Sequence, residues 1–141
     1  MANELVGKLS LDLRFFENPD FYDKLQNARR EADWRALQIM NNGFYIVQNI
    51  ITLISFAAIL HQLRREPQMA QEYAEEGLAI STEHGLVMYE AQSTMTRAWA
   101  LIEQGRRGET IQQMREGFAA YHASGTELLT PYFGSLLAEA L

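Results

Sequence analysis

Residues 44–60 read FYIVQNIITLISFAAIL, and these seventeen positions carry no formal charge. Such a helix needs either lipid or protein around it, so this stretch decides the fold. At 1.5 Å per residue it covers roughly 25 Å, whereas the hydrocarbon core of a membrane is roughly 30 Å thick. In a soluble protein its buried face would consist of Ile46, Ile50, Leu53, Ala57 and Leu60, widened by Val47, Ile51 and Ile54. We expect a buried core helix, covered by a helix over 20–40 and by the helices that follow, with a membrane span as the alternative.

The composition is that of a globular protein. A chain of 141 residues suffices for one domain, and 48% hydrophobic with 21% charged residues is too apolar for disorder. The absence of cysteine excludes disulfides and thiolate chemistry. The opening MANELVGKLS lacks the apolar run of a signal peptide. We therefore expect a cytoplasmic location, with membrane association through 44–60 as the alternative.

Charge is concentrated in the second half of the chain and is acidic there. Residues 67–141 carry four arginines, no lysine and ten glutamates. A nucleic-acid binder needs a basic surface to contact phosphates. We therefore expect no nucleic-acid partner.

The pattern of turn and apolar residues predicts an all-α fold of six or seven helices in antiparallel hairpins. Asn18 and Pro19 suit the N-cap and first position of a helix, and a short helix is expected before them. Asn41-Asn42-Gly43 is expected to break the chain before the uncharged stretch. Gly85 and Gly125 are expected to close helices in the left-handed conformation. Further helices are expected near 68–84, 87–104, 109–123 and 127–141.

The second half of the chain contains an internal repeat. Gly77 and Gly117 stand 40 residues apart, as do Gly85 and Gly125. Such a period holds two antiparallel helices and their turns. The stretch 44–60 is in phase with the period, because Ala58 stands 40 residues before Ala98. We expect it to form the first helix of the first repeat.

From about residue 61 to the end, the chain resembles the tetratricopeptide-type repeats of bacterial signalling ATPases and adenylate-cyclase-like regulators. The resemblance lies in HQLRREPQMAQEYAEEGLAISTEHG at 61–85, WALIEQG at 99–105 and GTELLTPY at 125–132. It implies a short solenoid over 61–141, preceded by two or three helices, that binds a protein partner or itself and carries out no reaction.

Residues 9–60 resemble part of the transmembrane domain of ABC-type exporters. FFENPDFYDKL would correspond to the intracellular loop with its coupling helix, and the apolar stretch to the start of a transmembrane helix. No ATPase domain follows, and Gly7-Lys8 lacks the glycines and the serine or threonine of a phosphate-binding loop. The resemblance implies, as the alternative function, a membrane-associated exporter fragment. The change of resemblance between 1–60 and 61–141 indicates a recombined chain.

No arrangement of residues predicts catalysis. His61, His84 and His122 stand near predicted helix ends, and no HExxH motif or comparable metal-ligand spacing occurs. We therefore expect a non-enzymatic protein without metal or cofactor. Aromatic residues dominate binding hot spots. The candidate partner-binding residues are Tyr89, Trp99, Tyr132 and Phe133, for which core packing is the alternative role.

Overall fold

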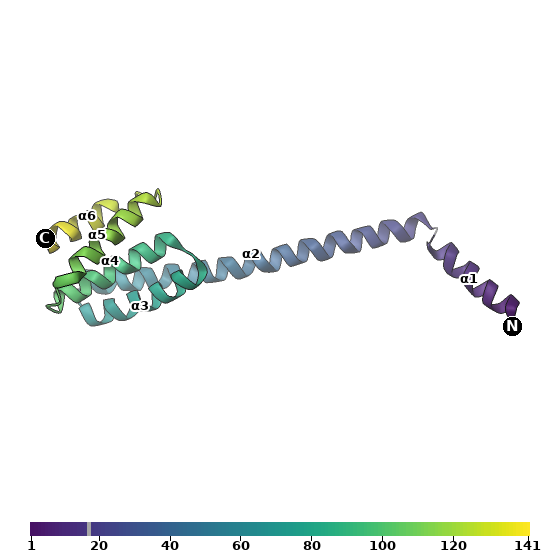
Figure 1. Cartoon of the computed structure of the whole chain (residues 1–141), viewed down its shortest axis with the longest axis horizontal. Helices are drawn as coiled ribbons and strands as arrows, with labels where there is room; N and C mark the ends of the chain where they lie inside the picture. Colours follow the sequence, from purple (N-terminus) through teal and green to yellow (C-terminus); the bar gives the residue numbers. More distant parts are fainter. Residues whose placement is uncertain (17) are drawn as a thin grey trace. The chain divides into compact units, whose positions relative to one another are not determined.

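The computed structural model describes all residues except Glu17, together with all side chains except those of Leu11, Asp12, Phe15 and Phe16. This described part of the chain is all-α, with antiparallel helices and no strand (Figure 1). The helices are α1 (Ala2–Phe16), α2 (Pro19–Leu63), α3 (Pro67–His84), α4 (Val87–Glu103), α5 (Gly108–Ala123) and α6 (Thr130–Ala140). The chain divides into two units, Met1–Tyr45 and Ile46–Leu141, and the division falls within α2.

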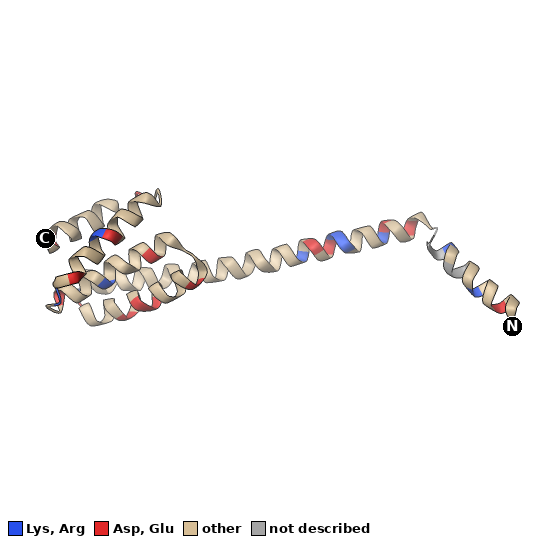
Figure 2. Cartoon of the chain, viewed as in Figure 1, with Lys and Arg blue, Asp and Glu red and all other residues tan. Residues whose placement is uncertain are grey.

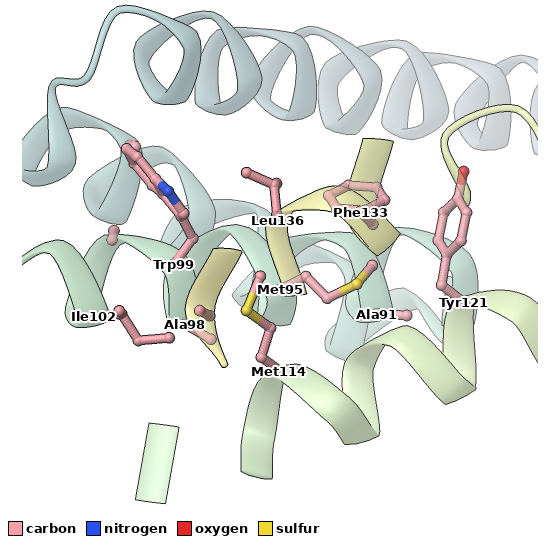
Figure 3. Packing of buried hydrophobic residues seen from close by; sticks show 12 residues of the cluster. Ala91, Met95, Ala98, Trp99, Ile102, Met114, Tyr121, Phe133 and Leu136 are labelled. Carbon is pink, nitrogen blue, oxygen red and sulfur yellow. The ribbon is translucent and has the colours of Figure 1, made fainter. Parts of the chain in front are cut away.

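In the second unit, α4 is the central helix. It packs against α3 and α5, and more lightly against α6. Apolar side chains on α4, α5 and α6 meet in the core of the unit, which Figure 3 shows from close by. Met95 of α4, Met114 of α5 and Phe133 of α6 are all fully buried. This core joins α4, α5 and α6, and α3 contributes Ala70 to it.

The helix ends recur every 20 residues. At three ends a backbone N–H donates to the carbonyl five residues earlier, a bond that closes the last helical turn. These bonds join Glu66 N to His61 O at 2.9 Å, Leu86 N to Ser81 O at 2.8 Å, and Arg106 N to Leu101 O at 2.9 Å. The residue before each donor is left-handed, with φ of 58° at Arg65, 65° at Gly85 and 87° at Gly105. Gly125 also has a positive φ of 77°, so the prediction for Gly85 and Gly125 is confirmed.

The left-handed turn after α3 gives a first testable prediction. Gly85→Ala should lower the free energy of unfolding by about 1–2 kcal/mol, because a Cβ disfavours this conformation. Gly108→Ala is the matched control, since Gly108 has no positive φ and open space around it. Urea denaturation followed by circular dichroism measures both variants. Equal stability of the two variants would contradict the role assigned to the turn.

The predicted break at Asn41-Asn42-Gly43 is wrong, because α2 runs without interruption from Pro19 to Leu63. Asparagine and glycine lower helix propensity by about 0.7 and 1 kcal/mol relative to alanine, but they do not forbid a helix as proline does. A break would also leave several backbone groups without intrahelical partners. Residues 20–40 therefore form no separate helix that could cover 44–60.

The predicted buried face of α2 is also wrong. Ile46, Ile50, Leu53 and Leu60 are between 46 and 70% exposed. Of the predicted residues only Ile51 is buried, and the other buried residues of α2 are Ser55, Ala58 and Gln62. One side of α2 packs against the repeat helices of the second unit, and no helix of that unit covers the other side. The prediction failed because it assumed neighbours on both sides of the helix.

Candidate functional site

A small groove in the second unit collects side chains from three helices and a connection. Its volume is about 140 Å³. The lining residues are Thr52, Ser55 and Phe56 of α2, Met88, Tyr89 and Gln92 of α4, Tyr121 of α5, and Thr126, Leu128 and Leu129 after it. We call this site the α2–α4 groove. It can accept one apolar side chain of a partner, because most of its lining is apolar.

Hydroxyl groups give the α2–α4 groove a polar side. The Thr52 hydroxyl donates to the carbonyl of Gln48 at 2.7 Å, so the Tyr89 hydroxyl donates to Thr52 Oγ1 at 2.8 Å. Ser55 is 6% exposed, and its Oγ has no hydrogen-bond partner. A buried polar atom without a partner costs free energy. Ser55 Oγ is therefore a group that a ligand with a donor or acceptor could satisfy.

Tyr121 forms the buried wall of the groove. Its side chain is 1% exposed, and its ring meets the ring of Phe133 edge to face at 5.3 Å. Burial raises the pKa of the Tyr121 phenol, and a hydrogen bond with the backbone of Leu129 opposes this rise. The phenol is therefore neutral at physiological pH. It can therefore donate a hydrogen bond.

A second hollow, of about 250 Å³, lies where the end of α2 meets α4 and α6. The hydroxyl of Tyr132 donates to Gln62 Oε1 at 3.0 Å, whereas Gln62 Nε2 has no partner. Burial raises the pKa of the Tyr132 phenol, and the charge of Arg65 opposes the rise. At the rim of this second hollow, Arg65 forms ion pairs with Glu139 at 2.8 Å and with Glu103 at 3.4 Å. These carboxylates raise the pKa of the guanidinium, the Glu139 hydrogen bond most.

The buried amide of Gln62 gives a second testable prediction. Tyr132→Phe should lower the free energy of unfolding by about 1–2 kcal/mol, because it leaves an amide that is 2% exposed without any partner. Gln62→Leu should cost much less, and combining both changes should restore most of the lost stability. Chemical denaturation of the three variants measures these values. A double variant as unstable as Tyr132→Phe alone would contradict this role of the pair.

The four aromatic residues predicted to bind a partner have different positions. Tyr89 is half-buried and lines the α2–α4 groove, and Tyr132 is half-buried and lines the second hollow. Trp99 and Phe133 are 3% and 0% exposed and belong to the core. This burial favours the alternative role of core packing for both, although Trp99 also lines the second hollow, and their predicted role in partner binding stays a prediction.

Several residues of the groove were not predicted from the sequence. Ser55 and Gln92 were not singled out, although a serine within an apolar run is a signal of a polar group inside the protein. Leu128 was not singled out either, and it is 85% exposed at the edge of the groove. Leu128 could have been identified as an apolar residue in the connection after Gly125.

In the described part of the chain, no group of three or more His, Asp or Glu residues could hold a metal ion. His61 pairs with Glu66 and stacks on Tyr73. A hollow of about 510 Å³ beside Trp34 is lined by residues of one stretch of α2.

No family model, curated protein or solved structure matches this chain. The all-α class with antiparallel helices therefore rests on the structure alone. The two family resemblances of the sequence stay predictions.

Proposed function

We propose that this chain is a non-catalytic helical-repeat scaffold that holds a protein partner in the α2–α4 groove. Residues 46–141 would form a short tetratricopeptide-like solenoid, in which the end of α2, α4 and α6 are the first helices of successive repeats. The groove is the observation that carries the proposal, because it gathers side chains from the first two of these helices and from the connection to the third.

The recurring backbone geometry supports the repeat. The left-handed residues Arg65 and Gly105 stand 40 positions apart, and so do Gly85 and Gly125. Gly77 and Gly117 are likewise 40 apart, and both contact α4. A period of two helices and two turns accounts for these positions. Such repeats stack only on their neighbours and leave an extended face for binding.

The groove indicates which kind of partner it fits. Its volume suits a single apolar side chain, and Ser55 Oγ offers a hydrogen bond at the base. We expect a peptide that inserts one large apolar residue. Leu128 would cover that residue from outside, because it is 85% exposed.

Selection of a random peptide library on the immobilised full chain tests this function. We expect enriched peptides with a common apolar residue, and their binding should fall at least tenfold on Leu128→Glu. Met69→Glu is the control, because Met69 is exposed on α3 and does not line the groove. Failure to enrich any peptide, or binding that Leu128→Glu leaves unchanged, would overturn the proposal.

A membrane-associated role is the second candidate, and one observation favours it. α2 is long and apolar enough to cross a membrane. A stretch of 18 residues within it has a mean hydropathy of 1.8, and 17% of this stretch is buried. However, α3 packs against 51–54 of this helix and carries Glu72, Glu75 and Glu76. Charged residues inside a bilayer cost about 2.5–3.5 kcal/mol each. A span would therefore require α3 to leave α2.

Flotation with phosphatidylcholine vesicles distinguishes the two functions. The scaffold predicts that the purified chain stays in the protein fraction without detergent. Recovery of the chain with the vesicles, resistant to alkaline extraction, would instead support the membrane role. Circular dichroism of both fractions reports whether the helices persist.

A further inference from the structure

The second hollow contains a buried amide that the protein uses only in part. The side chain of Gln62 lines this hollow, and Gln62 is 2% exposed. A primary amide carries two N–H donors and a carbonyl oxygen with two lone pairs. The Tyr132 hydroxyl donates to Gln62 Oε1 at 3.0 Å, whereas Gln62 Nε2 has no hydrogen-bond partner in the described part of the chain. Both donors and one lone pair of this amide are therefore available to a ligand.

The free donors of Gln62 indicate which group a ligand would bring. A buried donor without a partner costs free energy, and a leucine would fill the same space without this cost. Such a group in a folded protein therefore needs an explanation. A bound molecule that places an acceptor beside Gln62 Nε2 would supply the missing hydrogen bond.

The other walls of the second hollow suit a small apolar body. Trp99 and Leu136 are buried residues that line it, and Figure 3 shows their side chains next to each other. Leu63 adds an exposed apolar side chain to the lining. The volume of about 250 Å³ is slightly below the roughly 300 Å³ at which most ligand pockets begin. A ligand of this hollow would therefore be small, with one ring that packs against the indole of Trp99.

The charges around the hollow favour an uncharged ligand over an anion. Arg65 is the one basic residue of its lining, and its guanidinium is already paired with Glu139 and Glu103. Glu139 itself lines the hollow, so a ligand carboxylate would be repelled by a carboxylate there. The second unit as a whole contains more acidic than basic residues (Figure 2). The acceptor that Gln62 needs is therefore a neutral carbonyl oxygen.

We propose that the second hollow binds a small uncharged carboxamide that carries an apolar ring. The carbonyl oxygen of the ligand accepts a hydrogen bond from Gln62 Nε2, and the amino group of the ligand donates to Gln62 Oε1. Its ring packs against Trp99 and Leu136. This inference does not rest on the α2–α4 groove, because the two sites share no lining residue.

Titration of the full chain with benzamide, followed by NMR of the indole N–H groups, tests the site. The chain contains two tryptophans, of which Trp99 lines the hollow and Trp34 lies exposed in the first unit. Trp34→Phe assigns the two resonances. We expect benzamide to shift the Trp99 resonance until it saturates, and to leave the Trp34 resonance in place. No shift of the Trp99 resonance, or a shift that does not saturate, would overturn the proposal.

Two further probes of similar shape test the chemical class of the ligand on the unchanged chain. Benzoate replaces the amide by a carboxylate, and toluene removes it. Each should bind at least tenfold more weakly than benzamide. Equal or tighter binding of benzoate would indicate an anion site at Arg65, and equal binding of toluene would indicate an apolar cavity without a role for Gln62. Either result would overturn the proposed class.

A pair of matched variants tests the role of Gln62. Gln62→Leu should weaken benzamide binding at least tenfold, to the level of toluene. Gln92→Leu is the control, because Gln92 is also a buried glutamine but lines the α2–α4 groove. It should leave benzamide binding unchanged, and circular dichroism verifies that both variants fold. Binding that Gln62→Leu does not weaken, or that both variants weaken equally, would contradict the hydrogen bonds proposed for Gln62.

Discussion

Phe133→Ala is expected to lower the free energy of unfolding by about 3–5 kcal/mol, the range measured when large aromatic side chains are removed from a core. Phe133 is fully buried, and its ring contacts the rings of Tyr121 and Tyr132, each at 5.3 Å between centroids. The loss of this ring would leave a cavity between α5 and α6 (Figure 3). Urea denaturation at one low protein concentration measures the change.

Phe56→Ala is the matched control for this experiment. Phe56 is 59% exposed on α2, so its removal should change the stability of the monomer by less than about 1 kcal/mol. The comparison separates the two roles considered for Phe133. A partner contact predicts two variants of similar stability, whereas a core residue predicts a large difference between them.

The sequence allowed the helix ends to be predicted because their signals are local. Pro67 begins α3, and Gly85 and Gly125 take the left-handed conformation that a glycine at a helix end permits. A break at Gly43 was predicted by the same reasoning, and it failed there. Glycine costs a helix about 1 kcal/mol relative to alanine but does not forbid it, so Gly43 stays within α2, which runs from Pro19 to Leu63.

The buried face of α2 could not be predicted because both faces are apolar. Ile50 and Leu53 belong to one face and Ile51 and Ile54 to the other, so hydrophobic periodicity does not distinguish them. The face with Ile51 and Ile54 packs against α3 because Gly77 of α3 has no side chain and allows a close approach. A Cβ on Gly77 would lie 3.5 Å from Ile54 Cγ2 and 3.7 Å from Ile51 Cδ1. Such a tertiary contact cannot be predicted from the residue pattern of one helix.

The candidate site was predictable only in part for the same reason. Tyr89 and Tyr132 were among the four aromatic residues predicted to bind a partner, and both line hollows. Ser55 takes its position in the α2–α4 groove from the orientation of α2, which the sequence does not determine. Residue type alone did not decide between a partner contact and core packing for Trp99 and Phe133, because aromatic residues occur in cores as well as in interfaces.

Gly117→Ala is expected to lower the free energy of unfolding by about 2–3 kcal/mol, even though alanine favours a helix by about 1 kcal/mol over glycine. A Cβ at this position would lie 2.9 Å from Met95 Cγ and 3.3 Å from the carbonyl oxygen of Ala91. The carbonyl belongs to the backbone of α4, so it cannot move aside as a flexible side chain can. The added methyl group would therefore push α5 away from α4.

Gly134→Ala on α6 is the matched control, because a Cβ there would meet only ring atoms of Phe118 at the ordinary distance of 3.7 Å. This variant should be more stable than the original chain by up to about 1 kcal/mol, the gain in helix propensity alone. Thermal and urea denaturation of both variants measure the difference. Stabilisation by both substitutions would mean that α5 does not need its close approach to α4, and the glycine repeated at 77 and 117 would then have no packing role.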